Sequence, residues 1–195
     1  VSEDHLDVLM AIKKYRGTDE IRLIYTDGGT AIISSTTELK ISVETSTPGD
    51  PQNNGKIERS NGVILAHSRT RLVQAGLPSV FWPFVVRFVS FMLNTSIWKG
   101  ETPYFSRFGE DFTGLRLAFG QLVFFRPSKY DYSSKVHPRL LPGIFMGYKT
   151  GHGCKWTGDY WVMEIEAFDD KNLHVDAPAK DYPWWGTPHT TKVVR

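Results

Sequence analysis

Two acidic residues of this sequence stand where carboxylates commonly do chemistry. Asp27 follows the strand-like run 21–26 and precedes two glycines, so it belongs at the C-terminal end of a strand. Glu58 follows a loop rich in Pro, Gln, Asn and Gly and lies in the first turn of a predicted helix. Two carboxylates so placed can bind one or two divalent cations, chiefly Mg²⁺, through oxygen. Such a site activates an attacking hydroxyl or water and stabilises phosphoryl displacement.

The same two residues also have a purely structural interpretation. Asp27 can be an ordinary turn residue, because Asp-Gly sequences favour turns. Glu58 can be a charge that stabilises the N-terminus of a helix by opposing its dipole. The spacing of the pair leaves both interpretations open.

The first part of the chain predicts alternating helices and strands. Helices are predicted over 3–16, 55–75 and 79–94, with a short one after Thr102-Pro103 that ends near Gly109. Strands are predicted over 21–26 and 40–45, and a mobile loop over 47–55.

The pattern changes after about residue 115. Strand-like runs at 117–126, 143–148 and 160–168 are separated by loops rich in Pro, Gly, Ser and Asp, which is typical of a small antiparallel barrel or sheet. We therefore predict an α+β chain with a first domain over 1–110, a β-barrel module over 115–175 and an extended tail over 176–195.

Composition narrows the class of protein. Hydrophobic residues make up 41% of the chain, which excludes a disordered tail, and a single cysteine, Cys154, excludes a disulfide framework. The most apolar stretch, 77–93, is interrupted by two prolines and an arginine, so it predicts a buried helix and no membrane span.

Charge is unevenly distributed along the chain. Residues 61–150 carry 11 basic and 4 acidic side chains, a net charge of +7, whereas residues 1–60 carry 7 basic and 10 acidic ones, a net charge of −3. A basic segment beside an acidic cluster indicates a polyanion partner, although ordinary scatter of charge produces the same pattern. Aromatic and basic residues alternate from Phe124, Phe125 and Arg126 onward, which is compatible with a DNA-binding surface or with cationic loops of an ordinary β-module.

The sequence motifs around the two acids resemble those of the integrase core of copia-type retrotransposons and, more distantly, of retroviral integrases. The resemblance rests on residues 25–29 (YTDGG) and 47–61 (TPGDPQNNGKIERSN). It continues, in the family's order, through four downstream segments: 77–82 (LPSVFW), 102–104 (TPY), 115–120 (LRLAFG) and 142–148 (PGIFMGY).

This resemblance implies an RNase H-like core in which Asp27 and Glu58 are the second and third acids of an Asp-Asp-Glu triad that holds Mg²⁺ or Mn²⁺. The implied activity is trimming of the 3′ ends of element DNA and their transfer into target DNA, in the nucleus, by a protein that can form homo-oligomers. Asn53 and Asn54 would shape the loop. Gly62 and Leu65 stand where such cores often carry a basic residue, so DNA contact from this helix would have to come from Lys56, Arg59 or Arg69.

One departure from the family's pattern matters. In the family, the first acid of the triad lies on an earlier strand well before the second. The aspartates that precede Asp27 here, Asp4, Asp7 and Asp19, are predicted to be helix and loop residues and do not match that acid. We therefore expect an N-terminally truncated integrase that is inactive alone. The alternatives are a non-catalytic nucleic-acid-binding module and a structural relic.

Overall fold

The computed structural model describes residues 5–45, 55–127, 139–169, 171, 173–174 and 186–195, apart from the Lys56 side chain. The chain is α+β and contains two compact units, which are described separately. Unit 1 comprises residues 1–62 and 150–155, and unit 2 comprises residues 63–149 and 156–195. The long helix α3 (Gly55–Ala75) starts in unit 1 and ends in unit 2.

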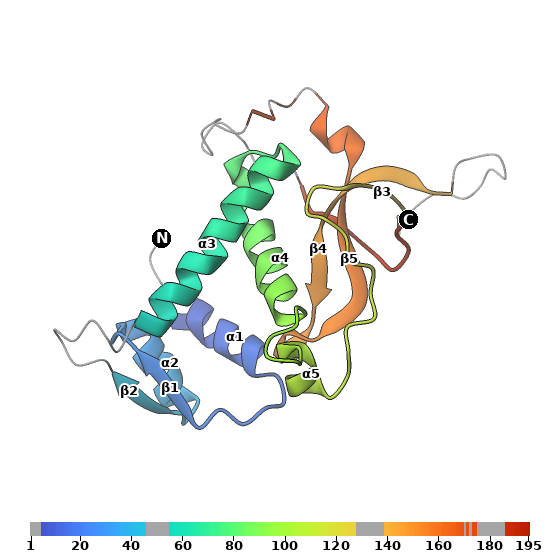
Figure 1. Ribbon diagram of the computed structural model, residues 1–195. Coiled ribbons are helices and arrows are strands. Elements are labelled where there is room, and N and C mark those ends of the chain that lie inside the picture. The colour runs from blue at the N-terminus through green and yellow to red at the C-terminus, as the bar shows by residue number, and fades with distance from the viewer. Residues whose placement is uncertain (1–4, 46–54, 128–138, 170, 172, 175–185) are drawn as a thin grey trace. The chain divides into compact units, whose positions relative to one another are not determined.

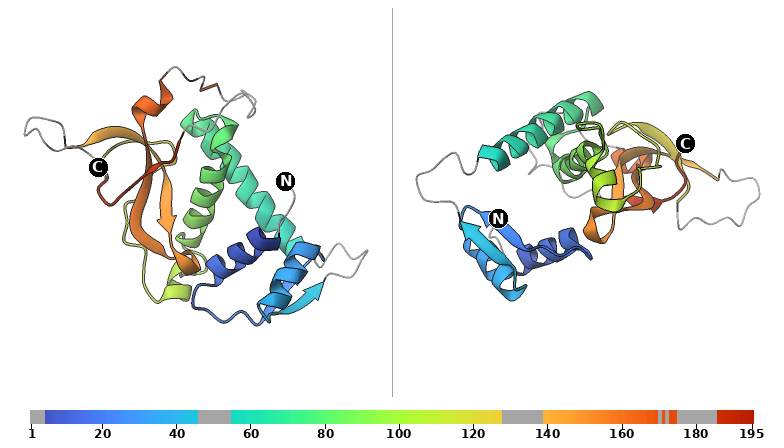
Figure 2. Two further views of the ribbon diagram at one scale, coloured as in Figure 1. Left: turned by 180° about the vertical axis from the view of Figure 1, so that it is seen from behind. Right: turned by 60° about the horizontal axis from the view of Figure 1, so that its bottom comes forward.

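Unit 1 is built on a strand–helix–strand crossover. Strand β1 (Leu23–Thr26) leads into helix α2 (Thr30–Glu38), which returns the chain to strand β2 (Ser42–Thr45). The two strands pair in parallel, from Leu23 opposite Ser42 to Thr26 opposite Thr45, and a parallel pair requires such a crossover. Helix α1 (His5–Arg16) packs beside α2 (Figure 2).

The sequence analysis did not predict α2, because its sequence TAIISSTTE is rich in residues of low helix propensity. In the structure, three of its hydroxyls donate to carbonyl oxygens one turn earlier. Ser35 donates to Ala31 O at 2.8 Å, Thr36 to Ile32 O at 2.9 Å and Thr37 to Ile33 O at 2.8 Å. These hydroxyls thereby have hydrogen-bond partners within the helix. Without such partners, Ser and Thr would favour turns over a helix.

A glycine pair joins α1 to the short 3₁₀ helix η2 (His152–Cys154) within unit 1. Gly17 ends α1 with φ +57°, and a Cβ there would lie 2.6 Å from the backbone nitrogen of Gly153. Both the left-handed conformation and the close approach require glycine at this position.

Unit 2 consists of helices beside a four-stranded antiparallel sheet (Figure 1). After α3 come the 3₁₀ helix η1 (Ser79–Phe81), α4 (Trp82–Asn94) and α5 (Pro103–Phe108). The strands of the sheet are β3 (Leu122–Phe125), β4 (Leu141–Thr150), β5 (Trp156–Glu164) and β6 (His189–Thr191), and they lie in the order β3-β4-β5-β6. The 3₁₀ helix η3 (Ile165–Phe168) follows β5.

The core of unit 2 forms between α4 and the sheet. Phe88 of α4 lies 5.5 Å from the ring of Phe119 and 6.1 Å from those of Phe145 and Tyr148. The Tyr148 hydroxyl donates to Leu115 O at 2.9 Å, and burial raises its pKa. The tyrosine therefore stays protonated and anchors the segment that leads into the sheet.

The last residues of the chain join the two edges of this sheet. β6 pairs with β5, and Val194 then bridges to Phe125 of β3. The Phe124 N–H donates to Arg195 O at 2.8 Å, and the Arg195 N–H donates to Phe124 O at 2.9 Å, which agrees with the C-terminus lying beside β3 in Figure 1. The predicted tail is thus extended here as a strand, which the sequence analysis did not identify.

Most of the predicted elements are confirmed. The prediction of α3 matches its observed bounds, and Pro83 lies in the first turn of α4. Helix α5 has the predicted cap, because Thr102 Oγ1 accepts from the Phe105 N–H at 3.0 Å and Gly109 ends the helix in the left-handed conformation. The RNase H-like core, the barrel and the domain limits 1–110, 115–175 and 176–195 stay predictions, and residues 47–54 of the predicted loop lie outside the described residues.

A buried hydroxyl in α3 gives a stability prediction. Ser68 is fully buried and its Oγ has no hydrogen-bond partner among the described residues. An unsatisfied buried hydroxyl costs about 1–3 kcal/mol, and alanine is the better helix former. We expect Ser68→Ala to raise the free energy of unfolding in urea by about 1 kcal/mol.

The matched control is Ser90→Ala in α4, whose Oγ donates to Val86 O at 2.8 Å. This variant should not gain stability, since its hydroxyl is satisfied. A loss of stability in Ser68→Ala would show that the hydroxyl has a partner.

Candidate functional site

Asp27 lies in the turn between β1 and α2. The preceding Thr26 is buried, and its Oγ1 donates to Asp27 Oδ1 at 3.2 Å. Gly28 has φ +94°, which places the backbone in a region that favours glycine, and α2 starts two residues later. This turn leaves the Asp27 side chain exposed at the end of the strand.

Glu58 lies in the first turn of α3 and is also exposed. The helix begins at Gly55, so the carboxylate stands near backbone N–H groups that carry partial positive charge. This position stabilises the helix by itself, and it also fixes where the carboxylate stands.

The structure brings the two predicted acids to one pocket of unit 1. The pocket has a volume of about 310 Å³. Its lining contains apolar and polar residues and consists of Ile24, Tyr25, Thr26, Asp27, Ile32, Ile57, Glu58 and Asn61. The two charged residues of this lining are both carboxylates, so the pocket is electronegative and suits a cation.

The sequence analysis did not single out Asn61 as a site residue. It lies one helical turn after Glu58, and side chains at this spacing share a helix face. Its amide oxygen is a further ligand of the kind that hard cations bind. The spacing of three residues from Glu58 was the available signal.

The other predicted DNA contacts are less defined. Asn53 and Asn54 lie outside the described residues, and Lys56 lies in α3 with its side chain outside them. Arg59 and Arg69 are exposed on α3, and neither lines the pocket.

The donor chemistry of the pocket fits a divalent metal ion. Asp27, Glu58 and Asn61 offer oxygen only, which Mg²⁺ and Mn²⁺ prefer. Within the described ranges, no group of three or more His, Cys, Asp and Glu side chains is placed to hold a metal. These two carboxylates and the amide would therefore form an incomplete shell that needs water or other donors.

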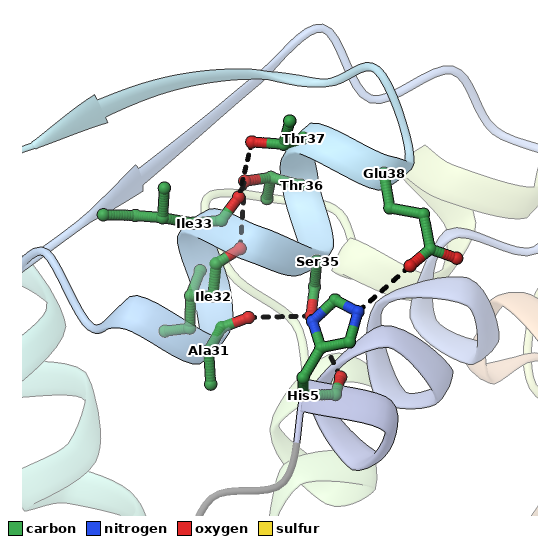
Figure 3. Close-up of polar contacts among 8 residues, drawn as sticks. All are labelled: His5, Ala31, Ile32, Ile33, Ser35, Thr36, Thr37 and Glu38. Carbon is green, nitrogen blue, oxygen red and sulfur yellow. Dashed lines mark hydrogen bonds and ion pairs between the residues drawn. The ribbon is translucent and has the colours of Figure 1, made fainter.

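A second polar cluster has the composition of a serine-hydrolase triad (Figure 3). His5 Nε2 lies 3.0 Å from Glu38 Oε2, and His5 Nδ1 lies 3.2 Å from Ser35 Oγ. All three residues belong to α1 and α2 of unit 1.

The position of Ser35 argues against a nucleophilic role. Its side chain is fully buried, whereas a nucleophile must reach its substrate. Its Oγ also contacts two backbone oxygens, those of Ala31 at 2.8 Å and His5 at 3.1 Å. The cluster is therefore a structural link between α1 and α2.

The prediction of an aromatic and basic surface on the β-module is wrong for one residue, Phe125. Phe125 is fully buried, because side chains alternate along β3, whereas Phe124 is 51% exposed. Phe125 therefore cannot stack on a base, and residues 128–138 of that surface lie outside the described residues.

None of the described helices is long and apolar enough to cross a membrane.

The chain is similar to a retrotransposon polyprotein. It is 28% identical over 117 residues to the retrovirus-related Pol polyprotein from transposon TNT 1-94 of Nicotiana tabacum. The match covers 54% of this chain and 8% of that polyprotein, so the chain corresponds to a small part of it. No protein-family model matches the chain. The similarity supports derivation from a retrotransposon Pol polyprotein without assigning the chain to one of its enzymes.

The triad-like cluster gives a prediction that separates linkage from catalysis. We expect Ser35→Ala to lower the free energy of unfolding by about 1–2 kcal/mol, because it removes a buried hydroxyl that contacts three partners. Ser34→Ala, on the exposed side of the same helix, should change it by less than about 0.5 kcal/mol.

A fluorophosphonate that labels activated serines should leave Ser35 unmodified, as measured by mass spectrometry of its tryptic peptide. Stoichiometric labelling of Ser35, with unchanged stability of Ser35→Ala, would contradict the structural role.

Proposed function

We propose that this chain is an integrase-derived part of a retrotransposon Pol polyprotein, and that Asp27 and Glu58 together bind a divalent cation used in DNA chemistry. The observation that carries the proposal is that both carboxylates line one pocket, from the end of β1 and the start of α3. The similarity to a retrotransposon Pol polyprotein supports the same origin.

The environment of the two acids supports a ligand role over a purely structural one. Both side chains are exposed, and among the described residues neither has an ion-pair partner. Two carboxylates at one pocket offer charged oxygen ligands of the kind that a divalent cation prefers. The Thr26 hydroxyl donates a hydrogen bond to Asp27 Oδ1, which restricts the position of that carboxylate.

In the intact integrase, the bound Mg²⁺ or Mn²⁺ would activate the attacking hydroxyl and neutralise charge on the phosphate. The residues of this chain would hold the ion and orient the phosphodiester. Asp27 and Glu58 would supply the charged oxygens and Asn61 a neutral one, while Lys56 and Arg59 would neutralise flanking phosphates. The partners would be the ends of the element DNA and a target DNA.

We further propose that this chain alone does not trim or join DNA ends. Two carboxylates line the described pocket, whereas the resemblance implies three acids. A third carboxylate, from another polypeptide segment, would complete the shell.

The second candidate function is a non-catalytic nucleic-acid-binding module. The observation that favours it is the net charge of +7 over residues 61–150, outside the acidic pocket. DNA affinity that survives Glu58→Gln and falls steeply with salt would favour this function, because counterion release dominates such binding.

Binding of Mn²⁺ tests the cation site directly. Isothermal titration calorimetry of the full chain should show one site that is weakened at least about tenfold by Asp27→Asn or Glu58→Gln, since each change removes one of two charged ligands. Glu44→Gln removes an exposed carboxylate of β2 outside the pocket and should leave the affinity unchanged.

The double variant Asp27→Asn/Glu58→Gln should show no saturable site at all. Unchanged Mn²⁺ affinity in this variant would refute the proposed cation site.

A further inference from the structure

A tight turn between α4 and α5 presents a tryptophan in a fixed conformation. The Trp98 N–H donates to Glu101 O at 2.7 Å, and the Glu101 N–H donates to Trp98 O at 3.3 Å. The two residues between them, Lys99 and Gly100, have φ values of 53° and 93°. Positive φ at both central positions defines a primed hairpin turn, which is uncommon for a lysine and needs support from its surroundings.

The surroundings supply that support on both sides of the turn. Thr95, which ends α4, is buried, and its carbonyl accepts from Arg116 Nη2 at 2.8 Å. On the other side, Ser106 Oγ donates to Glu101 Oε2 at 2.5 Å, which connects the turn to α5. The turn is therefore a projection of unit 2 that hydrogen bonds hold on both sides.

The projection exposes apolar surface that the fold does not use. Ile97 is 77% exposed and Trp98 is 71% exposed, the highest values among large apolar side chains in the described part of the chain. Leaving an indole in water forgoes the stabilisation that its burial would give. An exposed indole at the edge of a pocket is available to stack on a ligand.

A pocket of about 520 Å³ lies against this tryptophan. It belongs entirely to unit 2 and is lined by Trp98, Lys99, Glu101, Pro103, Ser106 and Arg107. The lining combines an aromatic ring, two cations and a hydroxyl–carboxylate pair. The Arg107 guanidinium also lies over the Phe108 ring, 5.3 Å from its centroid, which restricts its position.

We propose that this pocket binds one nucleotide of a single-stranded nucleic acid. The base stacks on the Trp98 indole, and Lys99 and Arg107 neutralise the adjacent phosphate. The Glu101 carboxylate accepts a hydrogen bond from an exocyclic amino group or a sugar hydroxyl. Stacking platforms with nearby cations are the general means by which proteins hold single strands without reading sequence.

Charge favours a nucleic acid over an apolar peptide as the occupant. The pocket carries two cations and one anion, and the segment 61–150 that contains it has a net charge of +7. This site shares no residue with the pocket of Asp27 and Glu58, so the inference does not depend on the proposed cation site.

Fluorescence anisotropy of a 5′-fluorescein-labelled dT12 oligonucleotide with the full chain tests the proposal. Trp98→Ala should weaken binding at least about fivefold, because stacking is worth about 1–3 kcal/mol per base. Trp98→Phe keeps an aromatic face and should restore most of the affinity. Lys99→Asn tolerates the positive φ and should lower the dependence of affinity on salt, since it removes a phosphate contact.

Two controls keep the result specific. Ile97→Ala removes an equally exposed apolar side chain outside the pocket and should leave the affinity unchanged. Glu44→Gln removes an exposed carboxylate outside both pockets and should also leave it unchanged. The Mn²⁺ titration is a separate measurement, so failure here and failure of the cation site are distinguishable. Circular dichroism spectra should show that each variant is folded.

Three results would overturn the proposal. The first is the absence of measurable binding by the unmodified chain at low salt. The second is unchanged affinity of Trp98→Ala, or an equal loss in Ile97→Ala. The third is a change of oligomeric state in Trp98→Ala, seen by light scattering, without a change in oligonucleotide affinity, which would indicate a protein-binding surface.

Discussion

The proposed function depends on one constraint, which is that two acids from distant parts of the chain line the same pocket. Asp27 and Glu58 lie far apart in the chain, yet the end of β1 and the start of α3 bring both to one pocket of about 310 Å³. Neither has an ion-pair partner among the described residues, and the side chains of Asp27, Glu58 and Asn61 offer oxygen ligands, so we propose that a divalent ion binds there.

The segments downstream of Glu58 that carry the family resemblance have structural explanations. Arg116 holds Thr95, Phe119 packs on Phe88, and a Cβ at Gly120 would lie 2.3 Å from Ala75 Cβ. Gly143 is equally constrained, because a Cβ there would lie 2.6 Å from Val162 Cγ1. Packing accounts for these residues. Asp27 and Glu58 are exposed, so packing does not explain them, and we propose that they carry the chemical part of the resemblance.

Sequence reasoning worked where local rules dominate and failed where tertiary contacts decide. Helix α3 has a clear apolar period, and α5 has a threonine cap and a glycine stop, so both were predictable. Helix α2 was missed because satisfied hydroxyls override its poor propensity, and β6 was missed because its pairing with distant β5 defines it. The two acids of the candidate site were singled out by the resemblance of the motifs around them, because their spacing and flanking turns alone leave a structural interpretation open. The Trp98 projection was not, since it depends on an unusual lysine conformation and on the distant Arg116.

Direct observation of the ion is the most decisive measurement. Crystals of the chain soaked in Mn²⁺, with data collected at the manganese absorption edge, should give an anomalous peak between the Asp27 and Glu58 carboxylates at the distances typical of oxygen ligands. Crystals of Glu58→Gln soaked in the same way should lack the peak. Fully ordered carboxylates with no anomalous density between them at saturating Mn²⁺ would contradict the account.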